Sequence, residues 1–138
     1  MNRPWTLLLL AWLVATSATL GALFLGEVMG MTPCVLCWYQ RIFMFPLAIV
    51  LGIAAYQDDR RGAVYALWLS LGGLAIAAYH TLLVAGLIPK AWVPCSAGVS
   101  CADQKLEILN GVQIPWLSLA AFVVLALLLI VYLRKSSR

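Results

Sequence analysis

The chain has 138 residues, of which 64% are hydrophobic and 10% are charged. Soluble domains carry roughly 25% charged residues, so this composition excludes an ordinary soluble domain and indicates a membrane protein. The formal net charge of +4 suits a surface of anionic lipid headgroups, and no feature of the chain predicts a nucleic-acid partner.

Four long apolar stretches follow one another, and each is a candidate membrane-spanning helix. They run from Trp5 to Leu25, from Ile42 to Tyr56, from Ala63 to Ile88 and from Ile114 to Leu133. The second stretch is shorter than the roughly 20 residues that a spanning helix needs. Thr32 followed by Pro33 is a helix-start signal, so we expect this helix to run from about Pro33 to Gln57.

These stretches predict an all-α integral membrane protein, a single four-transmembrane-helix bundle over residues 1–138. We expect spans at about 5–25, 36–57, 63–88 and 114–133, with loops at about 26–35 and 89–113 on one side of the membrane. Small residues along the third span, such as Gly72 and Gly73, are expected to let neighbouring helices approach closely.

Basic residues accumulate in the short cytoplasmic loops of membrane proteins, so their distribution predicts the orientation of the chain. One side carries six of them, Arg3, Arg60, Arg61, Arg134, Lys135 and Arg138, and the other carries three, Arg41, Lys90 and Lys105. Both termini and the Gln57–Gly62 turn are therefore expected to be cytoplasmic. The loops Gly26–Gln40 and Pro89–Gln113 would then face the extracytoplasmic compartment.

All four cysteines fall in these two outer loops. Cys34 and Cys37 form a Cys-x-x-Cys pair, and Cys95 and Cys101 form a second pair in an irregular, exposed segment. Since extracytoplasmic compartments permit disulfides, two close pairs indicate a disulfide system. Static disulfides are one alternative, and a zinc site of four thiolates is another, although we expect no metal. Four cysteines allow three pairings, and their spacing does not select one.

The first pair is placed for thiol chemistry. A thiolate is the form that attacks a disulfide, and a helix N-terminus or a nearby cation favours it. Cys34 is expected in the first turn of the second helix, and Arg41 lies four residues after Cys37, on the same helix face. A charged residue at an apolar boundary is a functional candidate, and the alternative is an arginine that extends to the lipid headgroups.

Two further residues are candidates for chemistry. His80, the only histidine, lies in the outer third of the third span, where an ionisable side chain should face the bundle interior. It is either a contact for a cofactor or a hydrogen-bonded packing residue. Glu27, seven residues before Cys34, is either a proton acceptor during thiol oxidation or a plain interfacial carboxylate.

Several motifs together carry a family resemblance. They are PCVLCWYQR, which contains Cys34, Cys37 and Arg41, then YHTLL around His80, the later cysteine pair, and IPWL at the start of the fourth span. This combination resembles the DsbB/BdbC family of disulfide bond formation proteins. The short chain and the close spacing of Cys95 and Cys101 are similar to the small BdbC-like members.

The resemblance implies a quinone-dependent thiol oxidase in the bacterial cytoplasmic (inner) membrane. Such an enzyme reoxidises an extracytoplasmic thioredoxin-fold oxidase of the DsbA or BdbD kind, passes the electrons to membrane quinone, either ubiquinone or menaquinone, and so sustains disulfide bond formation in secreted proteins. A more oxidising quinone pool can drive even strongly oxidising protein disulfides.

The resemblance also implies a role for each site residue. Cys95 would form the mixed disulfide with the partner protein, and Cys101 would resolve it. Electrons would then pass to Cys34 and Cys37, of which Cys37 lies nearest the quinone. Arg41 would hydrogen-bond a quinone oxygen, and His80 would lie near the same site.

Two other classes compete with this interpretation. A vitamin K epoxide reductase-like enzyme also has four helices and two thiol pairs, but its Cys-x-x-Cys would lie in the last span, and the fourth span here has no cysteine. A four-helix membrane scaffold stapled by two disulfides would have no redox activity. Cysteine substitutions would then affect only its stability.

Overall fold

The computed structural model describes residues 3–92, 107–108 and 112–138 of the chain, so Cys95 and Cys101 lie outside the described residues. The elements are, in order, α1 (Arg3–Leu23), the π-helical turn η1 (Phe24–Val28), α2 (Val35–Gln57), α3 (Arg60–Val84), the 3-10 turn η2 (Lys90–Trp92), β1 (Glu107–Ile108), β2 (Val112–Gln113) and α4 (Ile114–Ser136). The two short strands pair in the antiparallel sense directly before α4.

Within these ranges, four helices are long and apolar enough to cross a membrane, with mean hydropathies between 1.6 and 2.7. The predicted all-α four-helix architecture is confirmed, and the small β1–β2 pair is an addition that hydropathy alone does not reveal. Each helix packs against the next, and α4 closes the bundle against α1.

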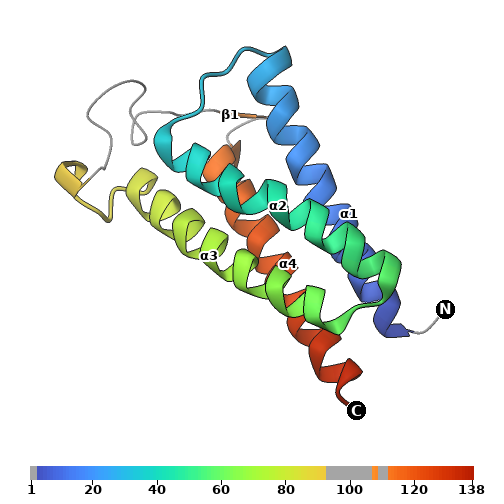
Figure 1. Cartoon of the computed structure of the whole chain (residues 1–138). Helices are drawn as coiled ribbons and strands as arrows, with labels where there is room; N and C mark the ends of the chain where they lie inside the picture. The colour runs from blue at the N-terminus through green and yellow to red at the C-terminus, as the bar shows by residue number, and fades with distance from the viewer. Residues whose placement is uncertain (1–2, 93–106, 109–111) are drawn as a thin grey trace.

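The two ends of the bundle differ in what they carry. Both termini and the α2–α3 turn lie at one end, which we call the terminal end (Figure 1). The start of α2, with Cys34 and Cys37, lies at the other, which we call the cysteine end. This arrangement agrees with an even number of antiparallel spans. That the terminal end faces the cytoplasm stays a prediction from the distribution of basic residues.

Helix α2 begins later than its capping signal predicts. Cys34 is the N-cap, with an extended backbone (φ −73°, ψ 170°), and Val35 is the first helical residue. The prediction of Thr32 as N-cap and Pro33 as first helical residue is therefore wrong. The Cys34 side chain is buried in a small cluster with Leu83 of α3. This packing between helices outweighs the local capping preference, and it still leaves Cys34 at the helix N-terminus.

Helix α3 stops short of the predicted end at Ile88 because a glycine terminates it. Gly86 has a positive φ of 82°, its amide donates to the Leu83 carbonyl at 3.2 Å, and the Leu87 amide donates to the Leu82 carbonyl at 3.1 Å. These two bonds form a Schellman motif, which ends a helix wherever the chain adopts a left-handed residue. The length of the apolar stretch alone does not predict this helix end.

At the terminal end, a short acidic turn joins α2 to α3. Asp59 is the N-cap of α3, and its carboxylate accepts from the Arg61 amide at 2.9 Å and from the Gly62 amide at 3.1 Å. Asp58 takes a left-handed conformation, and its carboxylate accepts a 3.3 Å hydrogen bond from the Tyr132 hydroxyl of α4. The turn is thereby tied to the last helix.

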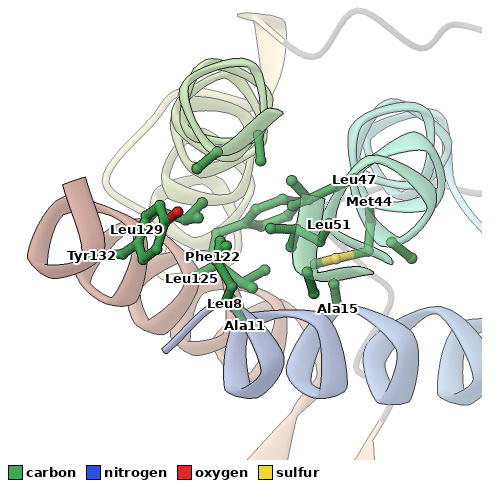
Figure 2. Packing of buried hydrophobic residues seen from close by; sticks show 14 of the residues in the cluster. Leu8, Ala11, Ala15, Met44, Leu47, Leu51, Phe122, Leu125, Leu129 and Tyr132 are labelled. Atoms are coloured by element: carbon green, nitrogen blue, oxygen red, sulfur yellow. The ribbon is translucent and has the colours of Figure 1, made fainter. Parts of the chain in front are cut away.

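The apolar core fills the terminal half of the bundle. Its large side chains come from three helices and include Leu8, Leu47, Leu51, Phe122, Leu125, Leu129 and Tyr132 (Figure 2). Glycines on α3 admit aromatic rings: a Cβ at Gly72 would lie 2.6 Å from Phe43 Cε1, and one at Gly73 would overlap the Phe122 ring. The small residues of this span thus allow the close approach that the sequence predicts.

Candidate dithiol site

The Cys-x-x-Cys pair lies at the N-terminus of α2. Cys34 is only 2% exposed, whereas Cys37 is partly exposed. Their sulfur atoms lie 3.2 Å apart. A disulfide bond is about 2.05 Å long, so the two sulfurs are in contact and need only a small shift to form one. The unpaired amides and the positive dipole end of a helix N-terminus favour negative charge at this position.

A chain of hydrogen bonds, here called the polar network, connects three helices behind this pair. The Ser118 hydroxyl of α4 donates to Gln40 Oε1 of α2 at 2.5 Å. Gln40 Nε2 lies 3.0 Å from Nδ1 of His80 on α3, and His80 Nε2 lies 3.9 Å from Cys34 Sγ. Gln40 and His80 are both buried. Buried polar groups in apolar surroundings are stabilised only when such bonds are made, so this network has a defined geometry.

The network contains one residue that the sequence singles out and two that it does not. His80 faces the bundle interior, as its position in the third span predicts. The sequence presents Gln40 only as part of the PCVLCWYQR motif, and no sequence pattern singles out Ser118. The available signal was their polarity, because each interrupts an otherwise apolar span, and polar groups inside a membrane are often functional.

Arg41 lies one helical turn after Cys37, and its side chain crosses to α1. Nη2 donates to the Ala22 carbonyl at 2.9 Å, and Cζ lies 5.4 Å from the centroid of the Trp38 ring. The guanidinium packs against Gly26 in η1, where an added Cβ would lie 2.9 Å from Nη2. The charged group is thus held against α1. A π-helical turn at this contact is consistent with a functional site.

A cavity of about 310 Å³ lies beside the pair, between α1, α2 and α4. Four residues supply its polar or reactive groups, namely Cys37, Gln40, Arg41 and Ser118. The rest of the lining is apolar and includes Leu25, Met44, Phe45, Ile114, Leu117 and Phe122. Leu117 is also 48% exposed, so the cavity reaches the outer surface of the bundle. Its size and its mainly apolar wall are typical of sites for small organic ligands.

Three of the described candidate residues, Cys34, His80 and Glu27, lie outside this cavity lining. His80, which the resemblance puts near a quinone, contacts Cys34 instead and is not among the residues that line the cavity. Glu27 is exposed in η1, and its role stays open. Any influence of His80 on a ligand in the cavity would therefore pass through the cysteine pair or through Gln40, which lines the cavity.

The same cluster has donors that suit a soft cation. Cys34 Sγ, Cys37 Sγ and a His80 ring nitrogen lie within 4.8 Å of one another. Thiolate and imidazole are ligands that zinc prefers, but a structural zinc site takes four, and the described residues bring together three. The four-thiolate zinc site is untested, because Cys95 and Cys101 lie outside the described residues.

Comparison with known proteins identifies the family. Residues 3–132 match the family described as "Disulfide bond formation protein DsbB". The chain is 52% identical over 137 residues to a "Probable disulfide formation protein" of Metapseudomonas resinovorans, a match that covers 99% of this chain and 95% of the relative. It is 39% identical over 127 residues to "Disulfide bond formation protein C" of Bacillus subtilis (strain 168), covering 91% of each.

No solved structure matches the chain. The family match nevertheless spans nearly all of it, and the relatives are covered over almost their full length. The four apolar helices, the dithiol at a helix N-terminus and these matches agree with one another. The chain belongs to the DsbB family of membrane proteins that act in disulfide bond formation.

Proposed function

We propose that the protein is a thiol:quinone oxidoreductase that reoxidises an extracytoplasmic thioredoxin-fold protein of the DsbA or BdbD kind. It would pass the electrons to membrane quinone and so sustain disulfide bond formation in secreted proteins. One observation carries the proposal: Cys37 and Arg41 line the same apolar cavity, which opens at the surface of a membrane bundle. Membership of the DsbB family supports the disulfide chemistry.

The cavity fits the head group of a quinone. Its volume of about 310 Å³ lies within the range of small-ligand sites, and its apolar wall suits a lipid-soluble ring. A guanidinium has five N–H donors, and the bond to Ala22 uses one of them, so Arg41 can also hold a quinone oxygen. When bound there, a quinone supplies an acceptor for two electrons and two protons. A fixed positive charge near its oxygen stabilises the negative charge that develops on reduction.

The proposed exchange balances at each stage. The reduced partner loses two electrons and two protons as its dithiol becomes a disulfide, and the Cys95–Cys101 disulfide becomes a dithiol. Cys95 and Cys101 then return to the disulfide as Cys34 and Cys37 are reduced. The Cys34–Cys37 disulfide finally forms again as the same two electrons and two protons pass to the quinone.

The positions of Cys34 and Cys37 support the proposed transfer of electrons from this pair to the quinone. Cys37 lies at the cavity wall, and Cys34 lies deeper, beside His80. The helix N-terminus favours the thiolate, which is the form that takes part in disulfide exchange. Cys37 is thus placed to exchange electrons with a ligand in the cavity, and Cys34 is its partner in the proposed disulfide.

The proposed location is the bacterial cytoplasmic membrane, with the cysteine end extracytoplasmic and both termini cytoplasmic. The distribution of basic residues supports this orientation, and the oxidising chemistry needs it, because disulfides persist outside the reducing cytosol. The membrane quinone pool lies within reach of a cavity that opens on the side of the bundle.

The test is quinone reduction by the purified protein in detergent, with a reduced DsbA-like protein as donor and soluble ubiquinone and menaquinone analogues as acceptors. We expect Cys37→Ser and Cys95→Ser each to abolish the reaction. With dithiothreitol as donor in place of the protein, Cys95→Ser should regain activity and Cys37→Ser should not, because the small thiol reaches the first pair directly.

A disulfide-stapled scaffold predicts a different outcome. The native chain would then reduce no quinone with either donor, and both substitutions would lower stability alone. That result would contradict the proposed function. Zinc that copurifies in stoichiometric amount would point instead to the metal site.

A further inference from the structure

We propose that Gln40 is a positioning residue whose amide fixes the tautomer of His80, so that the Nε2–H bond of the ring faces the Cys34 sulfur. The inference concerns the polar network of Ser118, Gln40 and His80. Only the benefit of this arrangement rests on the proposed function, since an enzyme that exchanges disulfides needs a stabilised thiolate.

The identity of the neighbour at Nδ1 decides the tautomer. A neutral imidazole carries one proton, and the nitrogen that lacks it accepts a hydrogen bond. Gln40 Nε2 lies 3.0 Å from His80 Nδ1, and an amide nitrogen only donates. Nδ1 therefore accepts, and the ring proton lies on Nε2, which is 3.9 Å from Cys34 Sγ.

Ser118 holds the end of the amide that faces away from the histidine. Its hydroxyl donates to Gln40 Oε1, so the amide oxygen points to α4 and the amide nitrogen points to α3. A reversed amide would present its oxygen to Nδ1 and would favour the opposite tautomer. Because Gln40 is 7% and His80 2% exposed, water competes little for these bonds, and the amide keeps this orientation between α4 and α3.

The tautomer matters because of the atom that it points at. An N–H group beside sulfur stabilises a thiolate, whereas the unprotonated nitrogen would face the same charge with its lone pair. Cys34 is reduced once in each proposed cycle, and its position as N-cap of α2 already favours negative charge. The polar network adds a second, directed donor to this sulfur. Gln40 thus acts on Cys34 through His80.

The tautomer can be observed directly because His80 is the only histidine. Protein labelled with ¹⁵N-histidine, purified in detergent without quinone or partner, gives long-range ¹H–¹⁵N spectra of this ring alone. We expect a neutral ring with protonated Nε2 and unprotonated Nδ1. A ring with the proton on Nδ1 would overturn the proposal.

Variants test whether Gln40 is the cause. Gln40→Met keeps the length of the side chain and removes the amide, so we expect a mixture of both tautomers. Gln40→Glu presents only acceptor oxygens to Nδ1, so we expect Nδ1 to become protonated, and this variant serves if Gln40→Met does not fold. Ser70→Ala is the matched control, because it removes a buried hydroxyl that donates to the Phe122 carbonyl away from the network. Unchanged spectra in both Gln40 variants would overturn the proposal.

The effect of the tautomer on the Cys34 thiolate is tested on a chain whose other three cysteines are replaced by serine, so that Cys34 is the single thiol. We expect Gln40→Met to lower the acid dissociation constant of the Cys34 thiol roughly fivefold, as expected for one lost hydrogen bond, and Ser70→Ala to leave it unchanged, both measured from the pH dependence of the ultraviolet thiolate absorbance. Equal constants in all three chains would overturn the link to Cys34. Neither measurement uses quinone or a protein partner, so failure here is distinct from failure of the proposed function, which the quinone assay reads.

Discussion

The terminal half and the cysteine half of the bundle are built from the same four helices but differ in what fills the space between them. In the terminal half, large apolar side chains such as Leu8, Leu51 and Leu129 are completely buried and fill the space between the helices. In the cysteine half, the same space holds the polar network and a cavity of about 310 Å³. The terminal half is a closed apolar core, and the cysteine half contains buried polar groups and a cavity.

This difference indicates where stability and function reside. Close van der Waals packing stabilises a helix bundle in a membrane, so the terminal half can hold the four helices together. A cavity contributes no packing and polar groups are costly to bury, so the cysteine half depends on that support. Substitutions in the two halves should therefore produce different kinds of defect.

The largest expected effect separates stability between the halves. Leu51→Ala removes a completely buried side chain from the terminal half, and we expect the free energy of unfolding to fall by about 3 kcal/mol. Leu117→Ala, at the half-exposed cavity wall, should change it by about 0.5 kcal/mol or less and raise the KM for quinone. Equilibrium unfolding in detergent measures both. Equal destabilisation by the two substitutions would remove the distinction.

The next effect concerns charge at the cavity. Arg41→Met should lower kcat/KM for quinone about 100-fold, because a positive donor beside the reacting oxygen is lost, while the unfolding midpoint changes little. Arg61→Met is the control, since Arg61 is an exposed arginine at the terminal end. If Arg41→Met reduced quinone at the native rate, the role proposed for Arg41 would be wrong.

The smallest effect tests how closely the guanidinium is positioned. Gly26→Ala would place a Cβ 2.9 Å from Arg41 Nη2, so the end of the flexible side chain must shift. We expect kcat/KM for quinone to fall about fivefold, a fraction of the roughly 100-fold that a 1 Å misplacement can cost. Gly21→Ala adds a methyl group at the cavity wall with no atom within 4 Å, so Arg41 keeps its position and we expect less effect. An equal loss in both variants would attribute the effect to the smaller cavity and not to Arg41.

The spans and the first cysteine pair follow from local sequence. The number of spans depends on the apolar length of contiguous segments, and each of the four predicted spans overlaps one membrane-length helix. Cys34, Cys37 and Arg41 share one end of α2 because residues three and four apart meet on a helix. The helix ends were less predictable. Cys34 caps α2 through packing on α3, and Gly86 ends α3 within an apolar run.

Sequence by itself determined a four-helix membrane protein with a dithiol and an arginine at one helix end. Only the tertiary structure decided that His80 contacts Cys34 across 46 residues, and that Gln40 bonds to Ser118 across 78. It also decided that Arg41 is held by α1 and that α4 completes the cavity. The physical reason is that hydropathy and helical spacing act within one segment. Contacts between helices depend on how each helix is rotated and packed against its neighbours, which no single segment encodes.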